Sequence, residues 1–162
     1  MTNQAFFLHT LNSEFDRFHN VVAALPADRL DYRHDPRSRS ATELVEHLIG
    51  HFEDLVELMD AGVIHHRMQV PFTDLNKAVD LLDRGARETA ARLTNVSDEA
   101  WAQPGEFFVG DRSIVKAPRH ALAWMLLLDA IHHRGQLSTL IRPMGGKVPS
   151  IYGPSADTVM GG

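Results

Sequence analysis

Asp129 and His133 are the side chains in this chain whose types and spacing most directly suggest chemistry. They lie four residues apart in an apolar stretch that predicts a helix, so both project from one helical face. A catalytic metal needs ligand atoms that converge from rigid walls, and a third ligand should come from another helix. His47, in a second helical segment, is the candidate for that ligand. The sequence therefore predicts a metal site formed by His47, Asp129 and His133.

Two imidazoles and one carboxylate leave a position on the metal for water or substrate, which is typical of a reactive site and not of a closed structural one. Zinc, nickel and ferrous iron all accept such ligands, so the set alone does not select the metal. At such a site bound water would ionise more easily, or an incoming thiol would bind as thiolate. A carboxylate at the edge of a buried helical face is also costly unless it is paired or metal-bound.

Simpler interpretations of the same residues stay open at this point. An aspartate and a histidine at this spacing are, taken alone, more often a surface hydrogen bond, and a single histidine such as His47 is more often a satisfied, partly buried side chain. His132 projects about 100 degrees away from His133 on a helix and is expected to face solvent. His65 and His66 resemble a polar loop pair and receive no role.

Length and composition favour one soluble domain, residues 1–162, with a sizeable core. The net charge of −5 disfavours a nucleic-acid surface, because phosphate binding needs a basic excess. The absence of cysteine excludes disulfides, zinc ribbons and a cysteine nucleophile. The start of the chain does not have the features of a signal peptide, and the apolar run from Ala121 to Leu128 is too short to cross a bilayer. We therefore expect a cytoplasmic protein without a membrane partner.

Apolar residues recur at helical spacing in four segments that must position the predicted site. The predicted helices run from about Asn3 to Leu25, from Ser40 to Gly62, from Thr73 to Leu93 and from Pro118 to Arg142. The second has the clearest start, because Ser40 and Glu43 have the spacing of a capping box. In the last, Trp124, Leu128 and Ile131 are expected to bury one side together with Leu137.

Four amphipathic segments without a sustained strand pattern predict an all-α fold, a four-helix bundle. Residues 97–117 interrupt the pattern and read either as two short extended pieces around Gly110-Asp111 or as an irregular loop. The length of this connection predicts a crossover before the last helix. The tail from Lys147 to Gly162 is rich in proline and glycine, so we expect it to lie over the bundle as irregular structure.

The stretch from Asp129 to Leu137, Asp-Ala-Ile-His-His-Arg-Gly-Gln-Leu, closely resembles the last helix of the DinB family of bacterial proteins. Arg-Pro-Met-Gly at 142–145 and Val-Pro-Ser-Ile-Tyr-Gly-Pro at 148–154 resemble the end of that family. The segment around His47, Glu-Leu-Val-Glu-His-Leu-Ile-Gly-His-Phe-Glu at 43–53, is similar to its second helix. The resemblance covers essentially the whole chain.

The resemblance implies a four-helix bundle of the DinB/YfiT-like type, usually a homodimer, with a divalent metal held by one residue of helix two and two of the last helix. Those positions match His47, Asp129 and His133. The family more commonly has histidine at the position of Asp129; aspartate is a shorter ligand and lowers the net charge of the site by one unit. The metal is expected to be nickel or zinc, with iron or manganese as alternatives. Gly135 is expected to let the last helix approach a neighbour closely.

Relatives in the wider superfamily transfer low-molecular-weight thiols to electrophiles or isomerise substrates with the help of a thiol. The resemblance therefore implies a metal-dependent thiol transferase, or a hydrolase, acting on a small electrophile. No residue is assigned a catalytic role, and Gln136 and Arg134 are hypotheses for supporting roles behind the ligands. The alternative is a non-catalytic, stress-induced dimer whose metal is structural or absent.

Overall fold

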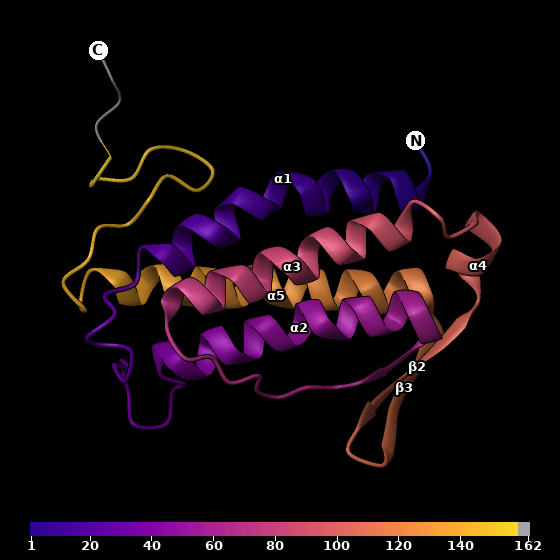
Figure 1. Cartoon of the computed structure of the whole chain (residues 1–162), viewed down its shortest axis with the longest axis horizontal. Coiled ribbons are helices and arrows are strands. Elements are labelled where there is room, and N and C mark those ends of the chain that lie inside the picture. Colours follow the sequence, from indigo (N-terminus) through magenta and orange to yellow (C-terminus); the bar gives the residue numbers. More distant parts are fainter. Residues whose placement is uncertain (159–162) are drawn as a thin grey trace.

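Four long helices, packed lengthwise, form most of the protein (Figure 1). The structure is a computed structural model that describes residues 1–158 of the 162. The long helices are α1 (Asn3–Ala23), α2 (Ala41–Ala61), α3 (Leu75–Leu93) and α5 (Arg119–Ile141). A short helix, α4 (Asp98–Ala102), and the strands β1 (Val63–His65), β2 (Pro104–Val109) and β3 (Arg112–Pro118) complete the described elements. None of the helices in residues 1–158 is both long and apolar enough to pass through a lipid bilayer.

Side-chain caps fix where the helices begin. Ser40 accepts a hydrogen bond from the backbone N–H of Glu43, and the Glu43 carboxylate accepts one from the Ser40 N–H, which confirms the predicted capping box. Asp74 caps α3 by accepting from the N–H of Lys77. At the other end of α2, Gly62 has a φ of 74°, the left-handed conformation that favours glycine after a helix. The start of the helix that carries His47 is therefore fixed by local sequence.

Contacts between the helices give their directions. Ion pairs from Arg84 to Glu53 and from Arg92 to Asp60 show that α2 and α3 run parallel. The contact of His51 with Asp129 and that of His47 with His133 show that α2 and α5 run antiparallel. By the same reasoning α1 runs antiparallel to α3 and parallel to α5. Two helices therefore run in each direction, and the two that carry the predicted ligands are antiparallel neighbours.

Because α2 and α3 are parallel, residues 62–74 must return along the length of α2, and Figure 1 shows this connection beside that helix. We call residues 62–74 the crossing segment. Its Val70 N–H donates to the carbonyl of Glu46, one turn from the start of α2. A Cβ on Gly50 would lie 2.1 Å from the carbonyl oxygen of Arg67, so only glycine lets the crossing segment lie this close.

The small sheet lies at the end of the bundle where α2 ends and α5 begins (Figure 1). Strands β2 and β3 form an antiparallel hairpin, and β1 from the crossing segment pairs parallel with β2. Of the two interpretations of residues 97–117, the extended pieces are therefore confirmed. The expectation of a purely all-α protein is wrong in this detail, because β1 is too short to show an alternating pattern in the sequence.

Three further expectations are corrected by the packing. The crossing connection lies between α2 and α3, whereas the one before α5 stays at a single end of the bundle, since the intervening residues form α4 and the hairpin. Leu128 is 58% exposed and does not belong to the core, because α5 is apolar on more than one face. Gly135 is exposed, and a Cβ there would meet no atom within 4 Å, so it makes no close helix contact.

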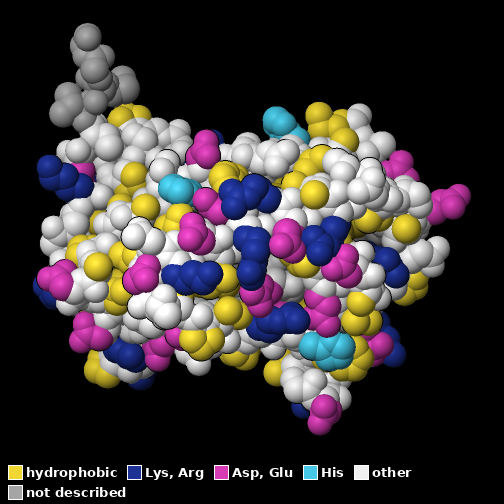
Figure 2. Space-filling view, viewed as in Figure 1, with side chains coloured by type: hydrophobic (Ala, Val, Ile, Leu, Met, Phe, Trp, Pro, Cys, Tyr) yellow, Lys and Arg dark blue, Asp and Glu magenta, His cyan; other side chains and the backbone are white. Residues whose placement is uncertain are grey.

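The core is continuous from α1 to α5 and is rich in leucine and aromatic residues. Phe18 of α1 packs edge-on against Phe52 of α2, with ring centroids 5.1 Å apart. At the surface formed by α1, α3 and α2, acidic and basic side chains are interspersed (Figure 2). Many of them are paired, as Arg92 is with Asp60 at 2.7 Å, so this face carries no block of one charge.

The described part of the tail lies over α1 and α5, as expected, and is held there by a buried arginine. The Arg134 guanidinium donates to Glu14, also buried, and to the hydroxyl of Tyr152 at 2.6 Å. That hydroxyl donates to Glu14 at 3.0 Å, and the Arg17 side chain donates to the backbone carbonyl of Ile151 at 2.8 Å. Arg134 therefore joins the tail to the bundle and lies away from the predicted metal ligands.

Replacing Arg134 with methionine should lower the free energy of unfolding by about 3 kcal/mol, because it leaves the Glu14 carboxylate buried without its main cation. Urea denaturation measures this change. The control is Arg142→Met, which removes an arginine 52% exposed and paired with Asp157 at 2.8 Å. It should cost less than about 1 kcal/mol. Equal losses in the two variants would contradict the structural role given to Arg134.

Candidate metal centre

The structure brings the three predicted ligands together between α2 and α5. His47 on α2 and His133 on α5 have ring centroids 4.7 Å apart, and Asp129 lies one turn before His133. A fourth group, His51, lies one turn after His47. One ligand atom from each of these four residues lies within 4.8 Å of every other, and we call them the histidine–aspartate cluster. This buried group has the composition and spacing to hold a divalent metal ion.

Short distances in the cluster join atoms that are potential ligands. Asp129 Oδ2 lies 3.0 Å from His51 Nε2 and 3.3 Å from His133 Nε2. Ligand atoms that surround zinc tetrahedrally at about 2.1 Å lie roughly 3.4 Å apart. The observed separations are close to that value, so a cation between these atoms would require little movement of the side chains.

Hydrogen bonds behind the cluster determine which ring nitrogen of two histidines faces inward. His47 Nδ1 lies 2.9 Å from the backbone carbonyl of Met68, which can only accept, so the nitrogen donates. His133 Nδ1 donates to Gln136 Oε1 at 2.7 Å. In both rings Nε2 is therefore the nitrogen that carries the lone pair when the imidazole is neutral. Such outer partners usually orient metal-binding histidines.

His51 is the group that most needs a partner. Its side chain is only 3% exposed, and neither ring nitrogen makes a hydrogen bond with any residue from 1 to 158. Its Nε2 lies 3.0 Å from Asp129 Oδ2 as an ion-pair contact, whereas its Nδ1 has no polar partner among residues 1–158. A buried polar atom without a partner is costly, and metal coordination would remove that cost. The cluster therefore fits a metal by an observation independent of the predicted ligand pattern.

The protonation states of the cluster suit a cation. Burial, together with His51 and the charge of Arg39, lowers the pKa of His47 to about 4, although its bond to Met68 acts in the opposite direction. Burial also lowers the pKa of His133. The contact with His51, followed by the charge of His133, holds the pKa of Asp129 well below its usual range. At neutral pH both imidazoles are neutral and the carboxylate is ionised, as metal binding requires.

Sequence reasoning assigned no role to His51, although the signal was present: His47 and His51 have the same four-residue spacing as Asp129 and His133. His132 is exposed, as expected. Gln136 touches His133, whereas Arg134 points toward α1 and touches no member of the cluster. Of the two hypotheses for supporting residues, the structure thus places only Gln136 behind a predicted ligand.

His65 and His66 differ, although the sequence suggested a single polar pair. The His65 side chain is 60% exposed and contacts Glu57, whereas that of His66 is 7% exposed and packs beside His47 and His51. His66 Nδ1 lies 2.6 Å from Asp54 Oδ2, and Asp54 is fully buried. These two groups satisfy each other, so they form a support beside the cluster.

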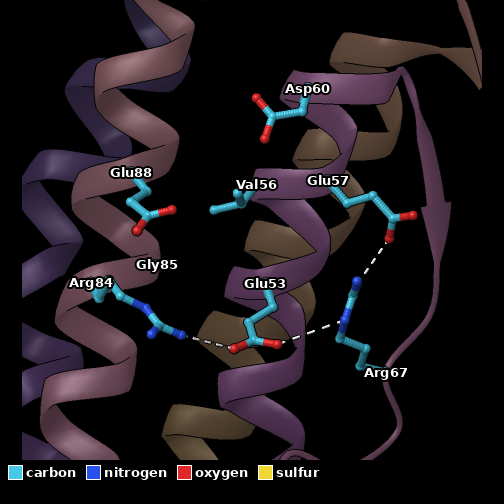
Figure 3. Close-up of a pocket in the computed structure, with 8 residues that line it drawn as sticks. All are labelled: Glu53, Val56, Glu57, Asp60, Arg67, Arg84, Gly85 and Glu88. Carbon is cyan, nitrogen blue, oxygen red and sulfur yellow. Dashed lines mark hydrogen bonds and ion pairs between the residues drawn. The ribbon is translucent and has the colours of Figure 1, made fainter.

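A charged hollow of about 360 Å³ lies between α2 and α3 (Figure 3), and Arg67 in its lining contacts this support. Figure 3 shows Arg67 and Arg84 reaching Glu53 from opposite sides, at 3.7 and 3.1 Å, and Arg67 reaching Glu57 at 2.8 Å. The Arg67 guanidinium also donates to Asp54 at 3.0 Å. Because its carboxylates are paired by arginines, this hollow is a structural network that ties the crossing segment to α2.

The side chains of the cluster differ in their exposure to solvent. The side chains of His51 and His133 are 3% and 10% exposed, whereas that of Asp129 is 47% exposed. Small molecules can therefore reach the cluster beside Asp129, while the histidines stay shielded. Chemically, the arrangement offers up to four donors to one cation with an accessible edge, which suits activation of water or of a thiol.

In protein freed of metal with a chelator, stability should fall between about pH 6.5 and about pH 4. The unfolded chain takes up a proton at His47 near 6.5, but the folded chain does so only near 4, so the stabilisation present above 6.5 is lost as the pH falls. At pH 5 the protonation of His47 in the unfolded chain lowers the free energy of unfolding by about 2 kcal/mol. Protonation of Asp129 changes the stability only below about pH 3.8, which lies outside this pH range. Urea denaturation at several pH values measures the free energy of unfolding of the wild type and of His47→Gln. The same pH dependence in both proteins would contradict the role given to His47.

The sequence and the fold are similar to those of known proteins. A sequence model of the DinB family matches residues 1–159. A DinB-like protein from Bacillus subtilis is 22% identical, with a TM-score of 0.70 over 91% of this chain and 99% of that one. A DinB-like protein from Bacillus cereus is 20% identical, with a TM-score of 0.72 over 90% of this chain and 95% of that one.

A more distant structure is a variant of the mycothiol-dependent maleylpyruvate isomerase, at 9% identity and a TM-score of 0.56 over 88% of this chain and 61% of that one. No curated protein matches the chain. At these identities the solved structures show a shared fold, and the match of the family model covers nearly the entire sequence. The chain therefore belongs to the DinB family.

Proposed function

We propose that this protein is a metal-dependent transferase that joins a low-molecular-weight thiol to a small electrophile. The histidine–aspartate cluster carries this proposal, above all the buried His51 whose ring nitrogens have no hydrogen-bond partner among residues 1–158. A cluster that only stabilised the fold would be expected to satisfy its own polar groups. In this cluster the potential ligand atoms lie within 4.8 Å of one another, and one of them belongs to the half-exposed carboxylate of Asp129.

The residues that would hold the metal are His47, Asp129 and His133, with His51 as a fourth donor. Nickel, iron and manganese accept more than four ligands, and zinc can expand to five, so four donors still leave a place for a reactant. All donors are nitrogen or oxygen atoms, which suits each of these ions. Nickel and zinc are the proposed ions, and the buried imidazoles favour them over harder cations.

A bound divalent ion lowers the pKa of a thiol that reaches it and so favours the thiolate, the nucleophilic form. In the overall reaction a C–S bond forms between the thiol sulfur and an electrophilic carbon, and the thiol proton goes to solvent. In a substitution the leaving group departs with its bonding pair, and in an addition the neighbouring carbon takes up a proton. The chain has no cysteine, so the sulfur must come with a cosubstrate.

The protein's own side chains prepare the site. The Met68 carbonyl and Gln136 Oε1 fix the rings of His47 and His133, so little reorientation is needed when a reactant binds. The histidine side chains are 3% to 10% exposed at His51 and His133, which limits contact with bulk water, and the more exposed Asp129 offers an approach to the cluster. Fold-level likeness adds support, because one neighbour is named a mycothiol-dependent isomerase.

Purified, untagged protein should contain about one divalent metal per chain, and His133→Ala should lose most of it, because the variant removes a ligand from the buried wall. Elemental analysis measures the content. The matched control is His132→Ala, since His132 is adjacent but exposed. Full metal content in His133→Ala would end the assignment, and equal loss in both variants would show that the effect is not specific to the cluster.

The metal-loaded protein should accelerate the reaction of a small thiol with the fluorogenic electrophile monochlorobimane. A thiol of pKa about 8.5 is only about 3% ionised at pH 7, so complete ionisation offers up to about a thirtyfold gain in rate. Fluorescence measures the rate with metal-loaded and chelator-treated protein. Loss of thermal stability on metal removal, without any difference in turnover for a range of thiols and electrophiles, would favour the alternative of a non-catalytic metal-binding dimer.

A further inference from the structure

Two cavities of different character meet the histidine–aspartate cluster. One, of about 300 Å³, is lined by Arg39, His34, Ser38 and Thr139 and reaches His133 and Gln136. We call it the polar cavity. The other, of about 580 Å³, has Ile114, Val115, Met125 and Leu128 on its walls and reaches His51 and Asp129. We call it the apolar cavity. The apolar cavity also touches the supporting His66, and the cluster and supporting residues that line one cavity do not line the other.

The cavities lie on either side of the cluster along the groove between α2 and α5. The polar cavity uses Leu44 of α2 with Gln136 and Leu140 of α5, toward the start of α2. The apolar cavity uses His51 of α2 with Met125 of α5, toward the end of α2. Because the two helices are antiparallel, these residues fall on opposite sides of the level at which His47 faces His133.

Arg39 gives the polar cavity an unbalanced positive charge. It is partly buried and makes no ion pair or side-chain hydrogen bond with any residue from 1 to 158. Its charge is close enough to lower the pKa of both His47 and His133. Neighbouring Arg37, by contrast, pairs with Asp35 at 3.1 Å and is 92% exposed. A guanidinium beside hydroxyl and amide groups is suited to bind a carboxylate.

The apolar cavity presents large hydrophobic side chains that the core does not use. Ile114 is 50% exposed, Met125 38% and Leu128 58%, and all three border this one cavity. Its size is within the range of small-molecule sites, which combine apolar walls with a few polar groups. Its polar lining consists of His51 and Asp129 of the cluster together with His66 and His132, so a small molecule in it would meet the cluster directly. A carboxylate in this cavity would have no cation to pair with among its lining residues.

We infer that the two reactants reach the cluster from opposite sides: a carboxylate-bearing thiol through the polar cavity, held by Arg39, and an electrophile with an apolar body through the apolar cavity. This inference rests on the proposed function and assigns its two substrate sites. Separate sites let both reactants be bound at once, which converts their encounter into a reaction between positioned groups.

The first test compares N-acetylcysteine with its uncharged methyl ester by calorimetric titration of zinc-loaded protein. The wild type should bind the acid at least about tenfold more tightly, because a charged hydrogen bond to Arg39 is lost in the ester. Arg39→Gln should remove this preference, and the matched variant Arg37→Gln should keep it. A preference that persists in Arg39→Gln would arise from the metal itself and would overturn the role of Arg39.

The second test follows the blue shift of the uncharged fluorescent dye prodan with both zinc-loaded and chelator-treated protein. Leu128→Gln should weaken dye binding about tenfold, because it removes an apolar wall. Val109→Thr, a change at an exposed hydrophobic residue outside the cavity, should leave it unchanged. Saturating N-acetylcysteine should not displace the dye, and displacement would mean a single shared cavity and overturn the inference.

Sedimentation of the same variants tests whether a second copy of the chain occupies the apolar cavity. The inference would be wrong if the wild type is a dimer that does not bind prodan and the Leu128→Gln variant is a monomer. This face would then be an interface between two copies of the chain. Zinc content is measured before either ligand is added. Failure to bind either zinc or nickel would overturn the proposed function, whereas metal binding with no selectivity between the two cavities would overturn only the assignment of substrate sites.

Discussion

The burial of polar groups between α2 and α5 is the constraint on which the rest of the structure depends. His47, His51 and His133 are buried there beside the half-exposed carboxylate of Asp129, and neither ring nitrogen of His51 has a hydrogen-bond partner among residues 1–158. Such groups oppose folding unless something outside the two helices stabilises them. The four-residue spacing brings these groups together: α2 contributes His47 and His51 from one face, and the antiparallel α5 contributes Asp129 and His133 opposite them. The connections between the helices supply part of the missing stabilisation, and the proposed cation would supply more.

The crossing segment has the largest share in that support. It supplies the Met68 carbonyl that orients His47, and Arg67, which fixes the buried Asp54 beside His66. This requires the segment to lie against α2 at Gly50, where any side chain would displace it. A connection that only joined two parallel helices could pass farther out. Its close path is therefore explained by the cluster, and the glycine in the middle of a helix is the cost of that path.

Much of this could be predicted from the sequence, and what was missed has identifiable causes. The helix carrying His47 was predictable because Ser40 and Glu43 form a local cap, and the meeting of His47 with His133 followed from helical spacing. The four-residue spacing of His47 and His51 was visible in the sequence, but the burial of His51 against His66 of the crossing segment was not, because that segment has no periodic pattern. Leu128 was misassigned because α5 is apolar on several faces, so periodicity could not identify the inward one. Local patterns thus predicted residues that the structure brings together, but only tertiary contacts revealed their surroundings.

The charge balance of the cluster connects its burial with thiol chemistry. Three neutral imidazoles and the Asp129 carboxylate around a divalent ion would leave one net positive charge in a poorly hydrated place. A thiolate would cancel that charge, whereas a neutral thiol would leave it uncompensated. With aspartate where the resemblance implies that histidine is more common, the proposed metal site would reach neutrality with a single anionic sulfur, and His51 would supply a third imidazole. Because Asp129 is also the exposed edge of the cluster and lines the apolar cavity, the residue that sets this balance lies on the approach through that cavity.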